Sequence, residues 1–112
     1  MTREEAVQSL VAFDRPLDEL RECVAAFPFD WDDAPLATLR REHLLAVLAR
    51  WQRGELTPAE VEDWANLVEV RDDLDLDPTD PAVAGAVFDL ANPQLQGQLH
   101  EVGPALVAKL GA

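Results

Sequence analysis

The boundary between two helices in the middle of the chain constrains the fold most. Gly54 predicts the end of one helix, because glycine adopts the left-handed backbone conformation without a steric penalty. Thr57 predicts the N-cap of the next helix, with Pro58 at its first position and Glu60 completing a capping box. Because only a few residues separate the two signals, we expect the two helices to be antiparallel neighbours.

Apolar residues recur at three- and four-residue spacing along most of the chain, which is typical of helices that bury one face. No strand pattern of convincing length is present. The sequence therefore predicts an all-α fold, a compact single-domain bundle of five to six short helices over residues 1–112 with a central antiparallel helical hairpin. Asp14 is the expected cap of the second helix, and Thr38 or Leu39 is the expected start of the third. The expected helices cover residues 3–13, 15–27, 38–53, 58–71 and 81–91, and a last helix lies somewhere within residues 98–110, with its start left open.

The net charge of −13 is unevenly distributed along the chain. Residues 1–37 carry −6 and residues 56–80 carry −8, whereas the arginine-bearing segment 38–55 between them carries +2 and residues 81–112 carry −1. Nucleic-acid binding is not expected, because phosphate affinity depends on lysine and arginine. A basic protein partner is favoured. The alternative is that the acidity only keeps the protein soluble.

The densest acidic stretch, residues 71–80, raises the question of a metal site. Asp73, Asp75 and Asp77 have the spacing of the first ligands of an EF-hand loop. Pro78 then stands where that loop needs glycine, and Ala84 stands where it needs a bidentate glutamate. We therefore expect no metal, and we interpret the stretch as an ordered connector whose leucines contact the core while its aspartates face outward.

Partner contact is the remaining use for this acidic stretch, and a solvated loop is the alternative. Trp31 is a further candidate, because it lies among three aspartates and tryptophan is enriched at interaction hot spots. It equally suits a residue that covers the core. The candidate partner-binding residues are Asp72, Asp73, Asp75, Asp77, Asp80 and Trp31.

Residue types that carry catalysis are sparse. His43 and His100 lie on separate expected helices, and His43 adjoins an apolar stripe that suits a packing role. Cys23 suits a buried thiol, and Ser9 has no nucleophile-elbow context. No glycine-rich phosphate loop is present. We therefore expect a protein that is not an enzyme and has no cofactor.

Neither a membrane span nor a signal peptide is indicated. No apolar run approaches 18 residues, and the first residues lack the apolar segment of a signal peptide. The single cysteine excludes an internal disulfide. We expect a cytoplasmic protein.

Five short motifs resemble a group of small bacterial helical proteins, some of which resemble immunity proteins of contact-dependent growth-inhibition and other polymorphic toxin systems. The similarity covers roughly residues 38–98. The motifs are residues 38–45 (TLRREHLL), 54–57 (GELT), 62–66 (EDWAN), 71–73 (RDD) and 90–93 (LANP).

This resemblance implies a non-enzymatic binder that masks a basic toxin domain. The acidic stretch at residues 72–80 and the helix carrying Trp64 would be the contact surface. Electrostatic steering toward a basic toxin is compatible with the acidic composition. The competing hypothesis is a structural or regulatory module that forms a homodimer through the nearly neutral residues 81–112.

Overall fold

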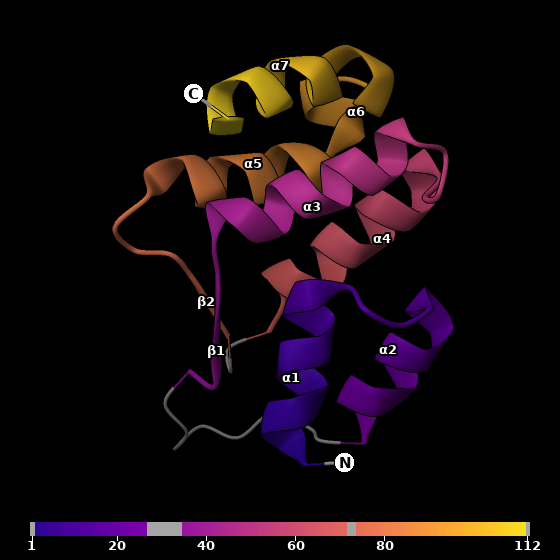
Figure 1. The fold of residues 1–112 in the computed structure, drawn as a ribbon, viewed down its shortest axis with the longest axis vertical. Helices are drawn as coiled ribbons and strands as arrows, with labels where there is room; N and C mark the ends of the chain where they lie inside the picture. Colours follow the sequence, from indigo (N-terminus) through magenta and orange to yellow (C-terminus); the bar gives the residue numbers. More distant parts are fainter. Residues whose placement is uncertain (1, 27–34, 72–73, 112) are drawn as a thin grey trace.

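Seven helices and two short strands make up the described part of the chain, in a computed structural model that describes residues 2–26, 35–71 and 74–111 (Figure 1). The fold is therefore mostly helical, as expected, but it is not strictly all-α. The elements in order are α1 (Arg3–Ala12), α2 (Leu17–Ala25), β1 (Ala37–Leu39), α3 (Arg41–Gln52), α4 (Pro58–Glu69), β2 (Leu74–Leu76), α5 (Pro81–Ala91), α6 (Pro93–Gln96) and α7 (Leu99–Gly111).

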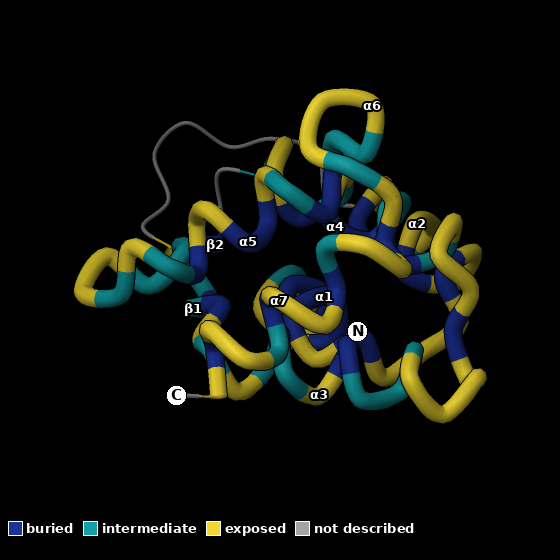
Figure 2. Tube along the Cα trace, turned by 90° about the horizontal axis from the view of Figure 1, so that it is seen from above, coloured by how far each residue is buried: buried dark blue, intermediate teal, exposed yellow. Residues whose placement is uncertain are grey.

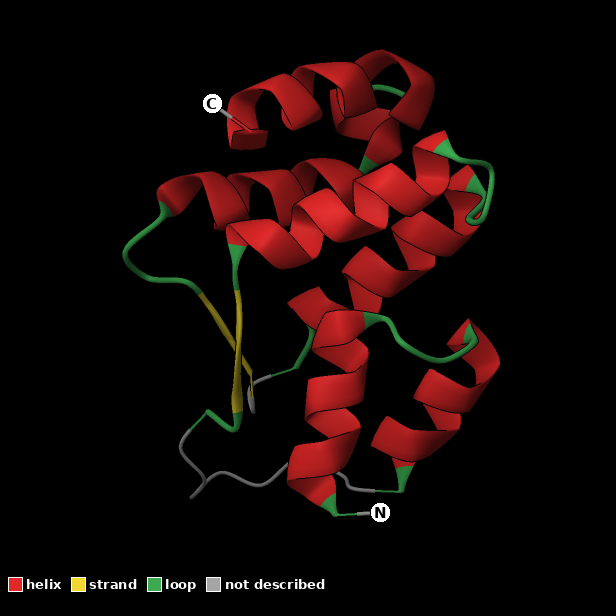
Figure 3. Ribbon diagram, in the orientation of Figure 1, coloured by secondary structure: helices red, strands yellow, loops and turns green. Residues whose placement is uncertain are grey.

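The helices follow one another from one end of the molecule to the other. Helices α1 and α2 lie at the N-terminal end, α3 to α5 lie in the middle, and α6 and α7 lie at the C-terminal end (Figures 1 and 3). Helix α4 packs most extensively against α5, while α7 packs against both α3 and α5. The radius of gyration of 13.4 Å is close to the value of about 13 Å expected for a compact chain of 100 residues.

Local capping signals set the helix boundaries. Thr57 accepts a hydrogen bond from the Glu60 backbone N–H, and the Glu60 carboxylate accepts one from the Thr57 N–H. This confirms the capping box that the sequence predicts at α4. Gly54 has a φ of +80°, so the end of α3 is also confirmed. Helix α1 has a second capping box, between Thr2 and Glu5.

The two strands correct the all-α prediction. Strand β1 pairs in parallel with β2, with Ala37 opposite Leu74 and Leu39 opposite Leu76. Each strand has three residues, which is too short for an alternating pattern to be recognised, and the partners lie far apart in sequence. Residues 37–39 are therefore extended, and the third helix begins at Arg41 rather than at Thr38 or Leu39.

The start of α2 and the segment after α5 also differ from those expected. Helix α2 begins at Leu17 with Pro16 as its N-cap, so Asp14 does not cap it. The one-turn helix α6 was not expected, because Asn92 and Pro93 indicate only where α5 ends. With α6 included, the described residues form seven helices instead of five to six.

A buried aromatic pair joins the N-terminal helices to the middle of the molecule. The Phe13 and Trp64 rings stack with their centroids 5.7 Å apart, and the Trp64 indole N–H donates to the Leu10 carbonyl at 2.7 Å. The Arg50 guanidinium lies over the Phe13 ring and also donates to the Phe13 carbonyl. These contacts tie α1, α3 and α4 together around one core, whose buried residues occupy the inside of the trace (Figure 2).

Trp51 has a different environment from Trp64. It is partly buried and packs beneath α7, where a Cβ added at Gly103 would lie 2.5 Å from the Trp51 ring. The two tryptophans therefore belong to one core but contact different helices. Gly103 allows α7 to approach α3 this closely.

Candidate functional site

The acidic stretch is an ordered connector in the described part, as expected. Leu74 is buried and Leu76 is partly buried, and β2 continues into a hydrogen bond from the Asp77 N–H to the Leu39 carbonyl. Of the candidate partner-binding residues, Asp72, Asp73 and Trp31 lie outside the described residues. Asp75 is partly exposed on β2.

Asp80 is committed to an internal ion pair. Its two carboxylate oxygens accept hydrogen bonds from Nε and Nη2 of Arg41 at 2.9 and 3.0 Å, and its side chain is only 20% exposed. Arg41 also donates to the Leu110 carbonyl at 3.1 Å. The hydrogen bond from Arg41 holds the pKa of Asp80 below its usual range. Asp80 thus fixes the start of α5 to α3 and to the end of α7.

Asp77 is also engaged within the molecule. Its carboxylate accepts hydrogen bonds from the Thr79 hydroxyl at 2.7 Å and the Thr79 N–H at 3.0 Å, and it lies 3.5 Å from Arg40. The two Thr79 hydrogen bonds are the main cause of its lowered pKa. Its side chain is 12% exposed. The expectation that the aspartates face outward is therefore wrong for Asp77 and Asp80.

The arginines within α3 and at its two ends therefore make contacts inside the molecule. Arg40 and Arg41 pair with the aspartates after β2, and Arg53 pairs with Glu55 beyond the end of the helix. Arg50 contacts Phe13. The positive segment of the sequence thus neutralises part of the acidic one.

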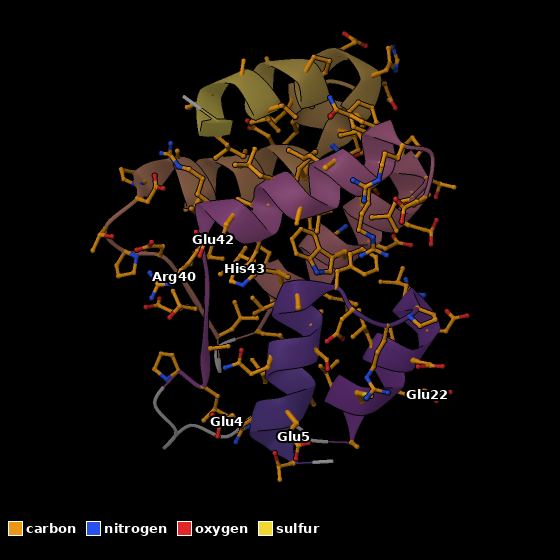
Figure 4. All side chains as sticks on the ribbon, viewed as in Figure 1. Glu4, Glu5, Glu22, Arg40, Glu42 and His43 are labelled. Atoms are coloured by element: carbon orange, nitrogen blue, oxygen red, sulfur yellow. The ribbon has the colours of Figure 1, made fainter. Side chains whose placement is uncertain are left out.

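His43 is a capping residue in this fold. Its Nδ1 accepts a hydrogen bond from the Arg40 backbone N–H at 2.9 Å, where a glutamate would serve in a usual capping box. Figure 4 shows it with Arg40 and Glu42 at the start of α3. Burial lowers the pKa of His43, with opposing effects from Glu42 and Arg40.

His43 lies near the start of α3, whereas His100, on α7, lies toward the other end of α3. Arg41 contacts Leu110 and Trp51 contacts Gly103, so α3 and α7 run antiparallel. His100, before Gly103, therefore lies beyond the Trp51 end of α3 and away from His43, where it is exposed beside Glu101. The two imidazoles therefore do not share a site.

An apolar cavity of about 200 Å³ lies between α4 and the C-terminal helices. Asn92 and Pro93 end α5, and the φ of +113° at Gly97 turns the chain from α6 into α7. This turn places the start of α7 beside the first two turns of α4. The walls include Pro58, Val61, Leu90, Leu99 and Val102.

Two carboxylates, Glu62 of α4 and Asp89 of α5, line the same cavity. Both residues are partly buried. Within residues 2–26, 35–71 and 74–111, neither makes an ion pair or a side-chain hydrogen bond. Two other α4 carboxylates differ, because Asp63 pairs with Arg21 at 3.1 Å and Glu60 serves the capping box.

Sequence reasoning did not single out Glu62 and Asp89. They are ordinary acidic residues on two separate helices, and only the packing of α4 against α5 brings them to one cavity. Two large apolar side chains next to this region in sequence are exposed, Phe88 at 45% and Leu95 at 73%. Exposed apolar groups near carboxylates are common on protein-binding surfaces.

The described residues lack both a metal-ligating cluster and a membrane-spanning helix. They contain no group of three histidine, cysteine or acidic side chains placed to hold a metal ion. No helix among them is both long enough and apolar enough to cross a bilayer.

Comparisons of the chain with protein-family models, with curated proteins and with solved structures find no match. A functional assignment therefore depends on the geometry and charge of the cavity between α4 and α7 and of the surfaces around it.

Proposed function

We propose that this chain is a non-enzymatic acidic binding protein of the immunity type, which binds a basic toxin domain in the cytoplasm and masks it. The observation that carries the proposal is the pair of acidic residues, Glu62 and Asp89, that line an apolar cavity and make no ion pair among the described residues. Carboxylates that lack an internal partner are free to pair with a cationic partner.

The surrounding charge supports the same partner class. Helix α4 carries four carboxylates and neither lysine nor arginine, in a chain of net charge −13. Such a field attracts a basic protein over a distance of about 8–10 Å at physiological salt and accelerates its association. The helix is also the one that the resemblance to immunity proteins implicates.

The aspartates of the acidic stretch have two different roles in this proposal. Asp77 and Asp80 hold the frame of β2 and α5 through Arg40 and Arg41. Asp75 is the described aspartate of the stretch that lacks an ion pair within residues 2–26, 35–71 and 74–111. Asp75 is a candidate partner contact in this proposal, as are Asp72, Asp73 and Trp31, which lie outside the described residues.

The direct test is co-expression with the products of adjacent genes. A basic product that arrests growth alone and fails to do so in the presence of this chain, and that co-purifies with it, would support the proposal. If every basic product binds nothing or remains toxic, the proposal fails. In a supporting case, Asp73→Asn with Asp75→Asn tests the acidic stretch: slower association with a weaker salt dependence places it at the interface, and unchanged kinetics removes it.

Self-association is a second candidate function, favoured by the exposed Phe88 and Leu95 in the nearly neutral C-terminal third. A homodimer through this surface would bury both side chains. Light scattering over a range of concentrations separates the two functions. A dimer that Leu95→Ser dissociates supports self-association, and a monomer at all concentrations excludes it.

A further inference from the structure

We propose that the cavity between α4, α5 and α7 receives one long cationic side chain, arginine or lysine, from the protein partner. The inference rests on the proposed function for the identity of the partner as a basic protein. It goes beyond that function by naming the group that is recognised and the residues that recognise it.

The size of the cavity suits a single side chain. Its volume of about 200 Å³ is below the roughly 300–1,000 Å³ of sites for drug-sized ligands. Pro58, Val61, Leu90, Leu99 and Val102 provide apolar walls. Arginine and lysine both carry an aliphatic stem that packs on such walls while the charged head stays near polar groups.

The carboxylates Glu62 and Asp89 provide the complement for the charged head. Each is partly buried and has no ion pair among the described residues. A cation at this position would meet two carboxylates of opposite charge that have no other ionic partner among the described residues. A hydrogen bond between a charged donor and a carboxylate is also stronger than a neutral one.

An inorganic cation fits less well than an organic one. The described residues contain no set of three acidic, histidine or cysteine side chains that could ligate a metal ion. The cavity walls are mostly apolar, and they leave a metal without the six or more oxygen ligands that calcium takes. An apolar wall for the stem beside two acidic residues suits an amphipathic cation.

The test uses Nα-acetyl-arginine methylamide as a probe and follows the backbone amides of the full chain by NMR. The uncharged isostere, Nα-acetyl-citrulline methylamide, is the matched ligand control. We expect the arginine probe to shift the amides of Val61, Leu90, Leu99 and Val102, and the citrulline probe to shift them much less.

Two double variants then separate the cavity from general charge. Glu62→Gln with Asp89→Asn should weaken the arginine probe about tenfold or more, the effect of losing hydrogen bonds to charged groups. Glu4→Gln with Glu22→Gln removes the same charge from α1 and α2, at the other end of the molecule (Figure 4), and should weaken it less than about twofold, because these distant charges are screened. Spectral dispersion reports whether each variant is folded.

Equal shifts with both probes would overturn the inference, as would equal weakening by both double variants or no shift at the cavity. These outcomes leave the proposed function open to its own test with adjacent gene products. Conversely, arginine binding at the cavity without any basic protein partner would retain the cation site and remove the proposed function.

Discussion

Replacing Trp64 with phenylalanine should destabilise the fold much more than the same replacement at Trp51. The Trp64 side chain is fully buried, and its indole N–H donates to the Leu10 carbonyl at 2.7 Å. Phenylalanine retains an aromatic ring against Phe13 but loses this donor and the second ring. Trp51 is only partly buried and is therefore the matched control.

The expected magnitude follows from these two losses. A lost hydrogen bond of this kind costs about 1 kcal/mol, and the space left by the smaller ring costs about 1–2 kcal/mol. The free energy of unfolding of Trp64→Phe should therefore fall by about 2–3 kcal/mol, a large share of the 5–15 kcal/mol typical of a domain. Trp51→Phe, with a partly exposed site, should cost less than about 1.5 kcal/mol.

Urea unfolding followed by far-UV circular dichroism measures both variants, because tryptophan fluorescence changes with the substitutions themselves. The denaturant slope should stay constant if only stability changes. If Trp64→Phe lowers the free energy of unfolding by less than about 1 kcal/mol, or by the same amount as Trp51→Phe, the buried contacts of Trp64 do not hold α1 to α4 as argued.

Three further predictions concern contacts that stabilise the fold. Burial lowers the pKa of His43, so the native state binds fewer protons than the unfolded chain, and stability falls as the pH drops below about 6.5. In urea titrations from pH 7 to pH 5, the stability of His43→Gln should fall less than that of the unsubstituted protein. An equal fall contradicts this role of His43. The pKa of Asp80 is lowered, so its contribution to stability is present above about pH 4 and is lost as the pH falls further. Asp80→Asn should lower the midpoint temperature of unfolding at pH 7, and its difference from the unsubstituted protein should shrink toward pH 2. A difference that stays constant with pH is the contrary result. Gly103→Ala should lower the free energy of unfolding by about 1–3 kcal/mol, because its Cβ meets Trp51. Gly85→Ala, with no atom within 4 Å of the new Cβ, should be neutral or stabilising by up to about 1 kcal/mol. Equal values for the two variants in urea unfolding would count against close packing of α3 on α7.

Local chemistry made most helices predictable from the sequence. The capping box at Thr57 and the glycine at position 54 determine the boundary between α3 and α4 through contacts within a few residues. The apolar spacing in α1 likewise identifies its buried face, which contains Ala6 and Leu10. Such features depend on neighbours in sequence, so a single sequence is sufficient to find them.

The strands and the cavity depend on contacts between distant segments. The pairing of Ala37 with Leu74 joins residues far apart in the chain and leaves no periodic signal in three-residue strands. Asp77 and Asp80 looked like an outward acidic surface because the sequence does not show that Arg40 and Arg41 lie beside them. The same limitation concealed that Glu62 and Asp89 line one cavity, which results from the packing of α4 on α5.

The central claim is that the cavity and its two carboxylates recognise a basic protein. The most direct measurement is the rate of association and the affinity between this chain and a basic product of an adjacent gene, at about 50 and 300 mM salt. We predict that Glu62→Gln with Asp89→Asn weakens binding about tenfold or more and reduces its salt dependence, while Glu4→Gln with Glu22→Gln changes the affinity less than about twofold. Unchanged affinity in the cavity variant, or equal loss in both variants, would contradict the claim.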